Sequence, residues 1–269
     1  MKLLPATLLA ASSLSSLFPN VTAFSAIDPR NSAGLTSKTT GWDMDQITPG
    51  RLRIEGETRH TFSFGDTSSD CVQVALESPN DRPVASEINL WLGPDYTPFS
   101  LYAHSENGSM YPIQSLIGTK GKYVNVELKN TGSKTFPMNA ACAYAIPPLS
   151  SAVKDIVTDN GGSAYIDGGA IRMYPFSAEV DQLQVLLKTD GKLLKAKIEL
   201  LNGPNNVKQE YEVYASSGDV TSLFVVFETK GAGNSIRVKN LASQEYPLDF
   251  YWRASVMGNK DAGQPMWNY

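Results

Sequence analysis

Short stretches in which apolar and polar residues alternate recur along most of the chain. Each of these stretches places its apolar side chains on one face of an extended backbone: 71–76, 87–92, 123–128, 183–187, 198–200 and 236–238. A period of two is typical of a half-buried β-strand. Residues 222–228 form a continuous apolar run instead, which is typical of a strand covered on both faces. The pattern therefore predicts a protein built from short strands.

Turn-forming residues separate the predicted strands. They lie at Asn107-Gly108, Asp190-Gly191, Asn202-Gly203-Pro204 and Ser217-Gly218-Asp219. No long segment sustains the i, i+3, i+4, i+7 spacing of an amphipathic helix. Many short strands with turns between them favour an all-β fold made of antiparallel β-sandwiches of roughly 100 residues each.

The pattern also repeats along the chain, at a spacing of 110–112 residues. The matched segments stay in the same order: Ile54-Glu55-Gly56 with Ile166-Asp167-Gly168, Val72-Gln73-Val74 with Leu183-Gln184-Val185, Gly93-Pro94 with Gly203-Pro204, Thr119-Lys120-Gly121 with Thr229-Lys230-Gly231, and Lys129-Asn130 with Lys239-Asn240. This order predicts two tandem homologous sandwich domains that arose by internal duplication. We assign them to residues 48–146 and 164–256, joined by a linker at 147–163 that holds a short helical turn at 151–158.

The first forty residues predict a targeting presequence. Residues 1–23 have the form of a signal peptide, because Lys2 precedes a short apolar stretch that ends in small residues. Residues 24–40 begin with Phe24 and are rich in Ser and Thr with little acid, which is transit-peptide composition. A signal peptide followed by Phe and a transit-like stretch resembles the bipartite plastid presequence of diatoms and related algae.

Composition narrows the function classes. The chain has 269 residues, a formal net charge of −4 and a pI near 5.3, which argues against a nucleic-acid partner. Removing residues 1–40 takes away three basic residues and one acidic residue, so 20 basic and 26 acidic residues remain and the net charge becomes −6. No other apolar run approaches 18 residues, so we expect no membrane span.

Residues that could carry chemistry are scarce. His60 and His104 are the two histidines, too few for a three-histidine zinc site, and we interpret both as strand-surface residues. Cys71 and Cys142 occupy unmatched positions of the repeat, and we expect reduced, half-buried thiols, with a disulfide as the lesser alternative. Phosphate-loop, dinucleotide, zinc-protease and serine-hydrolase motifs are absent from the sequence, although scattered carboxylates leave a glycosidase pair open. We therefore predict a non-enzyme with no catalytic residue, metal or cofactor.

Two groups of aromatic residues suggest binding. The first surrounds one predicted strand and loop, and comprises Trp91, Tyr96, Phe99, Tyr102 and Tyr111. These rings could stack on sugars, or about half of them could belong to the core. The second lies in the C-terminal extension, residues 257–269, where a polar, glycine-bearing arm precedes Gln264, Pro265, Met266, Trp267 and Tyr269. Because Trp and Tyr are enriched at binding hot spots, these residues are candidates for a self-assembly interface, the alternative being that they fold back onto their own domain.

The presequence, the two homologous β-domains and the aromatic-tipped extension together resemble the pyrenoid shell proteins of diatoms. The resemblance covers nearly the whole chain, including residues 91–94, Lys129-Asn130 and residues 264–267. It implies a structural protein that assembles with copies of itself into a sheet-like lattice around the Rubisco-filled pyrenoid. It also implies a place in the chloroplast stroma at the pyrenoid periphery, a role in CO2 concentration and carbon fixation, and Rubisco or other pyrenoid components as further candidate partners.

Two other functions stay open at this point. A secreted or matrix-associated carbohydrate-binding double sandwich would use the aromatic residues around Trp91 and would leave the cell. An enzyme of the inorganic-carbon pathway, such as a carbonic anhydrase, would need metal ligands that two histidines and two cysteines supply poorly.

Overall fold

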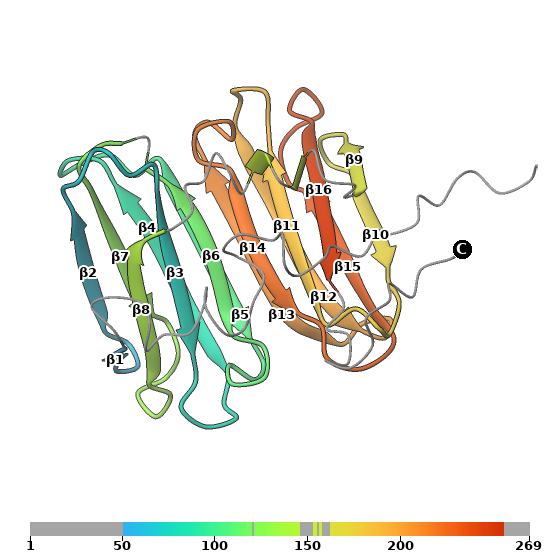
Figure 1. Ribbon diagram of the computed structural model, residues 1–269, viewed down its shortest axis with the longest axis horizontal. Helices are drawn as coiled ribbons and strands as arrows, with labels where there is room; N and C mark the ends of the chain where they lie inside the picture. Colours follow the sequence, from blue (N-terminus) through green and yellow to red (C-terminus); the bar gives the residue numbers. More distant parts are fainter. Residues whose placement is uncertain (1–50, 120, 146–152, 155, 158–161, 256–269) are drawn as a thin grey trace, which may run out of the picture.

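A computed structural model describes residues 51–119, 121–145, 153–154, 156–157 and 162–255. Within these residues the chain forms two stacked antiparallel sheets of eight strands each (Figure 1). The first sheet has the order β1 (Leu52–Ile54), β8 (Met138–Tyr144), β3 (Cys71–Glu77), β6 (Ile113–Gly118), β14 (Leu223–Glu228), β11 (Gln182–Lys188), β16 (Leu248–Ser255) and β9 (Gly162–Ile166). The second sheet has the order β10 (Ile171–Pro175), β15 (Asn234–Asn240), β12 (Leu194–Asn202), β13 (Val207–Ala215), β5 (Phe99–Ser105), β4 (Val84–Trp91), β7 (Val124–Asn130) and β2 (Arg59–Phe64).

The strands follow the alternation of the sequence. The stretches 71–76 and 123–128 become β3 and β7, and their apolar residues enter a core shared by the two sheets. The continuous run at 222–228 becomes β14, which lies in the middle of the first sheet and is buried at every residue. The all-β antiparallel sandwich expected from the sequence is confirmed.

The two halves of the chain have the same strand order. In each sheet, the four strands from one edge to the centre belong to the first half of the chain, and the four strands from the centre to the other edge belong to the second half. Each second-half strand has the number of its first-half counterpart plus eight, and the counterparts lie at equal distances from the centre. The halves meet where β5 pairs with β13 and β6 pairs with β14. The two expected units are therefore not separate bodies, because both sheets run through them without a break (Figure 1). Pairing the central strands removes four edges that would otherwise expose unsatisfied backbone groups.

The segment between the halves contributes short elements. Residues 153–154 and 156–157 are helical, inside the turn expected at 151–158. Strand β9 begins at Gly162, so the second half starts two residues earlier than the predicted boundary at 164. The presequence assigned to residues 1–40 and the extension at 257–269 lie outside the described residues.

Matched residues of the repeat make matched contacts. The side-chain amide of Asn130 donates a hydrogen bond to the carbonyl oxygen of Ile54 (3.2 Å), and Asn240 does the same to Ile166 (3.1 Å). Each asparagine thereby ties the end of a strand in the second sheet to an edge strand of the first sheet. The repeated Lys-Asn pair in the sequence thus marks a connection between layers.

A second matched position explains the repeated Ile-acid-Gly segment. A Cβ atom on Gly56 would lie 1.9 Å from the carbonyl oxygen of Ser133, and one on Gly168 would lie 1.8 Å from that of Ser243. These distances are far below van der Waals contact, so both positions require glycine.

Candidate functional site

The two histidines lie apart on the second sheet. His60 is an exposed residue of the edge strand β2, and its ring meets that of Phe62 edge-on at 4.7 Å. His104 lies on β5 between Ala85 and Glu210 of the neighbouring strands. Neither position belongs to a group of three His, Cys, Asp or Glu residues able to hold a metal ion, a kind of cluster not found anywhere in the described part of the chain.

The two cysteines lie on opposite faces of the first sheet. Cys142 packs into the core between the sheets, whereas Cys71, on the neighbouring strand β3, packs into a smaller apolar cluster on the outer face. The two thiols form no disulfide with each other. Both are fully buried rather than half-buried as expected, and burial raises the pKa of the Cys142 thiol well above its ordinary value. Cys142 is thus a small core residue, not a nucleophile.

The five aromatic residues around Trp91 do not form one platform. Phe99 and Tyr111 are buried in the core, in agreement with the alternative that about half of the group is structural. Tyr96 and Tyr102 are 51% and 38% exposed. Tyr96 shares a hydrogen bond with Ser216 of the second half (3.0 Å), so it helps to join the halves. A sugar-stacking surface made of all five rings is excluded by this arrangement.

The outer face of the second sheet carries a network of ion pairs. The Glu199 carboxylate on β12 contacts the Arg237 guanidinium (2.5 Å) and the Lys239 ammonium (3.0 Å) on β15, and Lys197 contacts Glu210 (2.8 Å) on β13. Glu199 and Glu210 are directly opposite each other in the strand register, which makes them the nearest approach to a glycosidase carboxylate pair.

The electrostatics of this network oppose acid catalysis. The Glu199 side chain is 4% exposed. Burial pushes its pKa upward, but hydrogen bonds and charges from Arg237 and Lys239 outweigh burial and hold the pKa below its usual value. A carboxylate kept ionised in this way cannot donate a proton as a general acid. The network therefore binds neighbouring strands together and gives this face a polar, charged surface.

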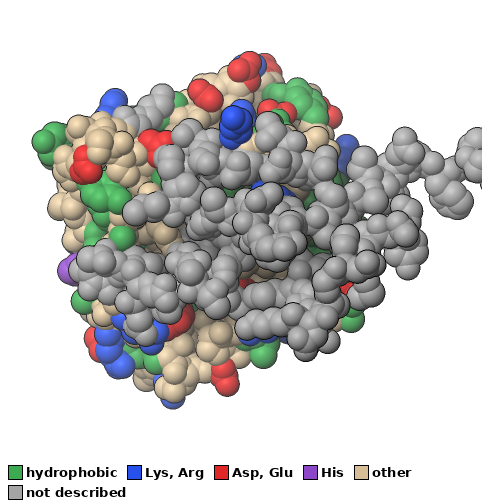
Figure 2. Space-filling view, in the orientation of Figure 1, with side chains coloured by type: hydrophobic (Ala, Val, Ile, Leu, Met, Phe, Trp, Pro, Cys, Tyr) green, Lys and Arg blue, Asp and Glu red, His purple; other side chains and the backbone are tan. Residues whose placement is uncertain are grey.

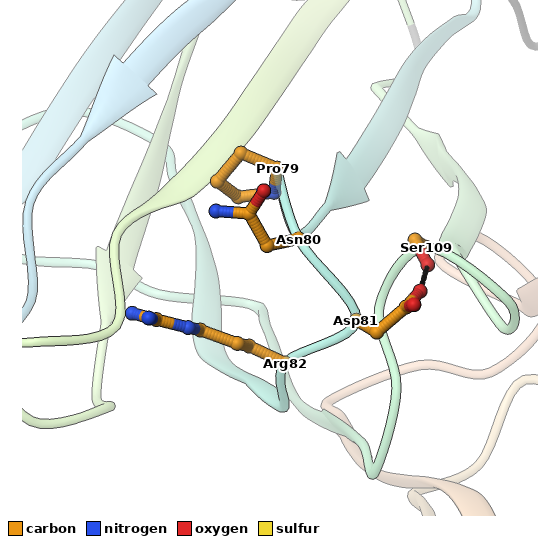
Figure 3. A pocket seen from close by; sticks show the side chains of 5 residues that line it. All are labelled: Pro79, Asn80, Asp81, Arg82 and Ser109. Atoms are coloured by element: carbon orange, nitrogen blue, oxygen red, sulfur yellow. Dashed lines mark hydrogen bonds between the residues drawn. The ribbon is translucent and has the colours of Figure 1, made fainter.

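A hollow of about 540 Å³ opens beside the loop between β3 and β4. Pro79, Asn80, Asp81, Arg82 and Ser109 line it (Figure 3). Ser109 donates a hydrogen bond to Asp81, and the Arg82 guanidinium donates one to the Thr135 carbonyl (3.0 Å). These polar groups are already paired within the protein, and the hollow holds neither a histidine nor a cysteine. The Ser109, Asp81 and Arg82 side chains therefore connect the loops around the hollow to one another.

The outer face of the first sheet is apolar at its centre. Leu116, Leu186 and Phe224 form a buried cluster there, and Val153 and Ile156 of the helical segment pack against it. On the face shown in Figure 2, acidic and basic side chains are interspersed around the visible rim. Within the described residues no helix is long and apolar enough to cross a membrane.

The two ends of the sandwich differ strongly. One end exposes β1 and β2, whose outward side chains include Arg53 and Arg59. The other end exposes β9 and β10, where Tyr165, Ile171 and Met173 are 64%, 56% and 49% exposed. Charged edges are the usual protection of a free strand, whereas apolar edges favour association.

The apolar edge at β9 and β10 was not among the interfaces predicted from the sequence. In the repeat alignment Ile171 and Met173 match Arg59 and Thr61, so the replacement of polar by apolar residues at outward positions was a usable signal. The predicted self-assembly interface lies outside the described residues and comprises Gln264, Pro265, Met266, Trp267 and Tyr269.

The fold and its surfaces define the class of protein, a broad β-sandwich of two eight-stranded sheets. Its outer surface carries a network of paired charges on the second sheet, and its β9/β10 edge is apolar. The chain belongs to the diatom pyrenoid shell protein family, whose model matches residues 42–254. That family is named for a structural shell of the pyrenoid, a compartment of the chloroplast.

Two solved structures show a distant likeness to the chain. Procruciferin, an 11S globulin from Brassica napus, is 9% identical with a TM-score of 0.21, covering 77% of this chain and 76% of its own. The VP2 subviral particle of infectious bursal disease virus is 10% identical with a TM-score of 0.15, covering 77% and 75%. No curated protein matches the chain.

Proposed function

We propose that the protein is a structural unit that assembles with copies of itself into a sheet-like lattice encasing the Rubisco-containing pyrenoid. The observation that carries the proposal is the family match over residues 42–254, which covers all described strands except the last residue of β16. The broad sandwich, with one polar face and one apolar edge, supports it, because such a body can meet several neighbours through different surfaces. A closed shell of this kind supports CO2 concentration and carbon fixation by enclosing Rubisco.

Electron microscopy of the purified protein tests the assembly. The chain is prepared at full length and without residues 1–40, and each form is stained across a range of protein and salt concentrations. We expect sheets or tubes. A species that stays monomeric under all of these conditions would refute the lattice.

We further propose that the C-terminal extension anchors neighbouring molecules. Removing residues 263–269, or changing Trp267→Ala, should weaken assembly while leaving the melting temperature of the sandwich unchanged, because these residues follow the last strand. Tyr123→Phe, which keeps the ring of an exposed residue away from the apolar edge, is the control. Variants that assemble like the parent chain would assign the anchor to another surface.

We place the protein in the chloroplast stroma at the pyrenoid periphery, delivered by residues 1–40. A fluorescent fusion of the full chain should mark a rim around the pyrenoid, and a fusion that lacks residues 24–40 should not reach the plastid. Fluorescence outside the cell or in the Golgi would contradict the proposal and would favour the secreted carbohydrate-binding alternative. Co-sedimentation of assembled sheets with Rubisco tests direct contact with that partner.

A further inference from the structure

The edge strand β10 has a free side on which a further strand could pair. It is the terminal strand of the second sheet and pairs only with β15 among the described strands. Its hydrogen bonds to β15 use the backbone groups of alternate residues, as the bond from the Phe176 N–H to the Asn234 carbonyl (3.3 Å) and that from the Asn240 N–H to the Ala170 carbonyl (3.0 Å) show. By this alternation the backbone groups of Ile171, Met173 and Pro175 point away from the sheet.

The side chains at these outward positions are apolar. Tyr174 packs inward against the rings of Phe250 and Trp252, so Ile171, Met173 and Pro175 lie on the opposite, outer face of the strand. Ile171 and Met173 are each about half exposed, and none of the three carries a charge. An unpaired strand with apolar outward residues is a template for another strand.

The opposite edge lacks this character. On β2 the backbone groups that point away from the sheet belong to Arg59, Thr61 and Ser63, since the Asn130 N–H donates to the Thr58 carbonyl (2.9 Å). The Arg59 side chain is among the more exposed ion-pair partners of the structure. A charge at this position is the usual device that prevents edge-to-edge pairing. One end of the molecule is thus protected and the other is open.

We infer that the open edge pairs with the same edge of a second copy, so that β10 of each molecule forms an antiparallel ladder with β10 of its partner around a two-fold axis at Met173. This inference rests on the proposed self-assembly and names one of its contacts. It places apolar residues against apolar residues, which a head-to-tail contact between β10 and β2 would not do. The pairing of β5 with β13 inside the chain, where Leu101 faces Val213, already joins equivalent strands of the two halves in this manner.

Backbone hydrogen bonds select the register. With Met173 opposite Met173 of the second copy, Ile171 falls opposite Pro175, and the Ile171 N–H donates to the Pro175 carbonyl. Proline has no N–H to return, so the Ile171 carbonyl would be left without a donor from the partner strand. That carbonyl already accepts a hydrogen bond from the Arg172 guanidinium (3.2 Å). The one acceptor that this register cannot satisfy is therefore satisfied within the chain.

The inward side chains suit the same register. Arg172 falls opposite Tyr174 of the second copy, in a pair whose backbones do not bond to each other and whose side chains therefore lie close together. A guanidinium beside an aromatic ring gains a cation–π contact. The register is thus supported on both faces of the strand.

Cross-linking through one introduced cysteine in the full chain tests the pairing. Met173→Cys on its two-fold axis should form a disulfide-linked dimer on mild oxidation, resolved on a non-reducing gel. The matched control is Thr61→Cys, the equivalent position of the protected edge, which should stay uncross-linked alone. The parent chain is the second control, because Cys71 and Cys142 are buried. A cross-link that forms only when Thr61→Cys and Met173→Cys are mixed would overturn the two-fold pairing in favour of a head-to-tail contact.

A charge variant gives the complementary result. Met173→Glu should weaken dimerisation, measured by analytical ultracentrifugation, by about tenfold or more, because two carboxylates would face each other across the axis. Thr61→Glu should leave it unchanged. Sheets in the microscope with no cross-link at Met173→Cys would overturn the pairing while the proposed function stands. A cross-link at Met173→Cys without sheets would retain the pairing and refute the lattice.

Discussion

The two halves meet where β5 pairs with β13 and β6 pairs with β14, a contact that we call the seam, and its strength can be tested at Tyr211. This β13 residue is fully buried, and its hydroxyl accepts hydrogen bonds from the backbone N–H of Gln114 in the first half (3.3 Å) and from the side-chain amide of Gln209 (3.0 Å). Its ring packs edge-on against Phe227 at 5.3 Å. Tyr211→Phe removes the hydroxyl and keeps the ring, so it isolates the polar contribution to the seam.

The expected loss of stability follows from the hydrogen bond that each partner of the Tyr211 hydroxyl loses. The Gln209 amide keeps its bond to the Pro112 carbonyl (3.0 Å), so it stays satisfied in the variant. The Gln114 N–H loses the Tyr211 hydroxyl, and a buried unsatisfied donor costs about 1–3 kcal/mol. Because the bond is long, we expect a loss of about 1–2 kcal/mol in the free energy of unfolding, or a fall of about 2–8 °C in melting temperature for a chain of this size.

Chemical denaturation monitored by circular dichroism and tryptophan fluorescence measures this loss. Both probes should report one transition, since the sheets run through both halves, and the slope with denaturant should not change. Tyr165→Phe, an exposed residue, should match the parent chain within about 0.5 kcal/mol. If Tyr211→Phe were as stable as the parent chain, the hydroxyl would not hold the seam. Two separate transitions would show that the halves unfold independently.

Two further substitutions test the fold and the charge network. Gly168→Ala should destabilise the protein by several kcal/mol or prevent folding, because its Cβ meets the Ser243 carbonyl, whereas Gly191→Ala has open space and should cost only about 1 kcal/mol for its positive φ of 66°. The lowered pKa of Glu199 predicts stability that is complete above the unfolded pKa of about 4.3 and is lost as the pH falls through the folded value. Glu199→Gln should therefore reduce the free energy of unfolding by about 1–3 kcal/mol at pH 7 and by less below pH 4, while Glu55→Gln at an exposed pair has no measurable effect. Equal losses for Glu199→Gln at both pH values would contradict this account.

Strand positions were predictable because one face of nearly every strand is buried. The same alternation also decides the aromatic group: Phe99 has the parity of Leu101 and Ala103 and enters the core with them, while Tyr102 has the opposite parity and stays on the surface. Applying the same alternation to residues 99–105 is therefore enough to distinguish the buried ring of Phe99 from the exposed ring of Tyr102 from the sequence alone.

The pairing of the halves could not be predicted in the same way. Strands β5 and β13 both alternate, and so do the edge strands, so the hydrophobic pattern alone does not say which edges meet. Contacts across the seam depend on single polar groups such as Gln209 and Ser115, whose partners lie about 100 positions away. The exposed residues of β10 were missed for a different reason. The repeat shows Ile171 and Met173 in place of Arg59 and Thr61, but this exchange indicates an exposed apolar edge only when β10 is known to be the terminal strand of its sheet.

The continuous sheets also determine how the molecule responds to bending. Two domains joined only by a linker would flex between themselves, but here two strand pairs, β5 with β13 and β6 with β14, cross the middle of the molecule in separate layers. Bending the sandwich at this seam would stretch the hydrogen bonds between strands in one sheet and compress those in the other sheet. The molecule has no hinge at its centre, so the curvature of any layer built from it must be set at the joints between molecules.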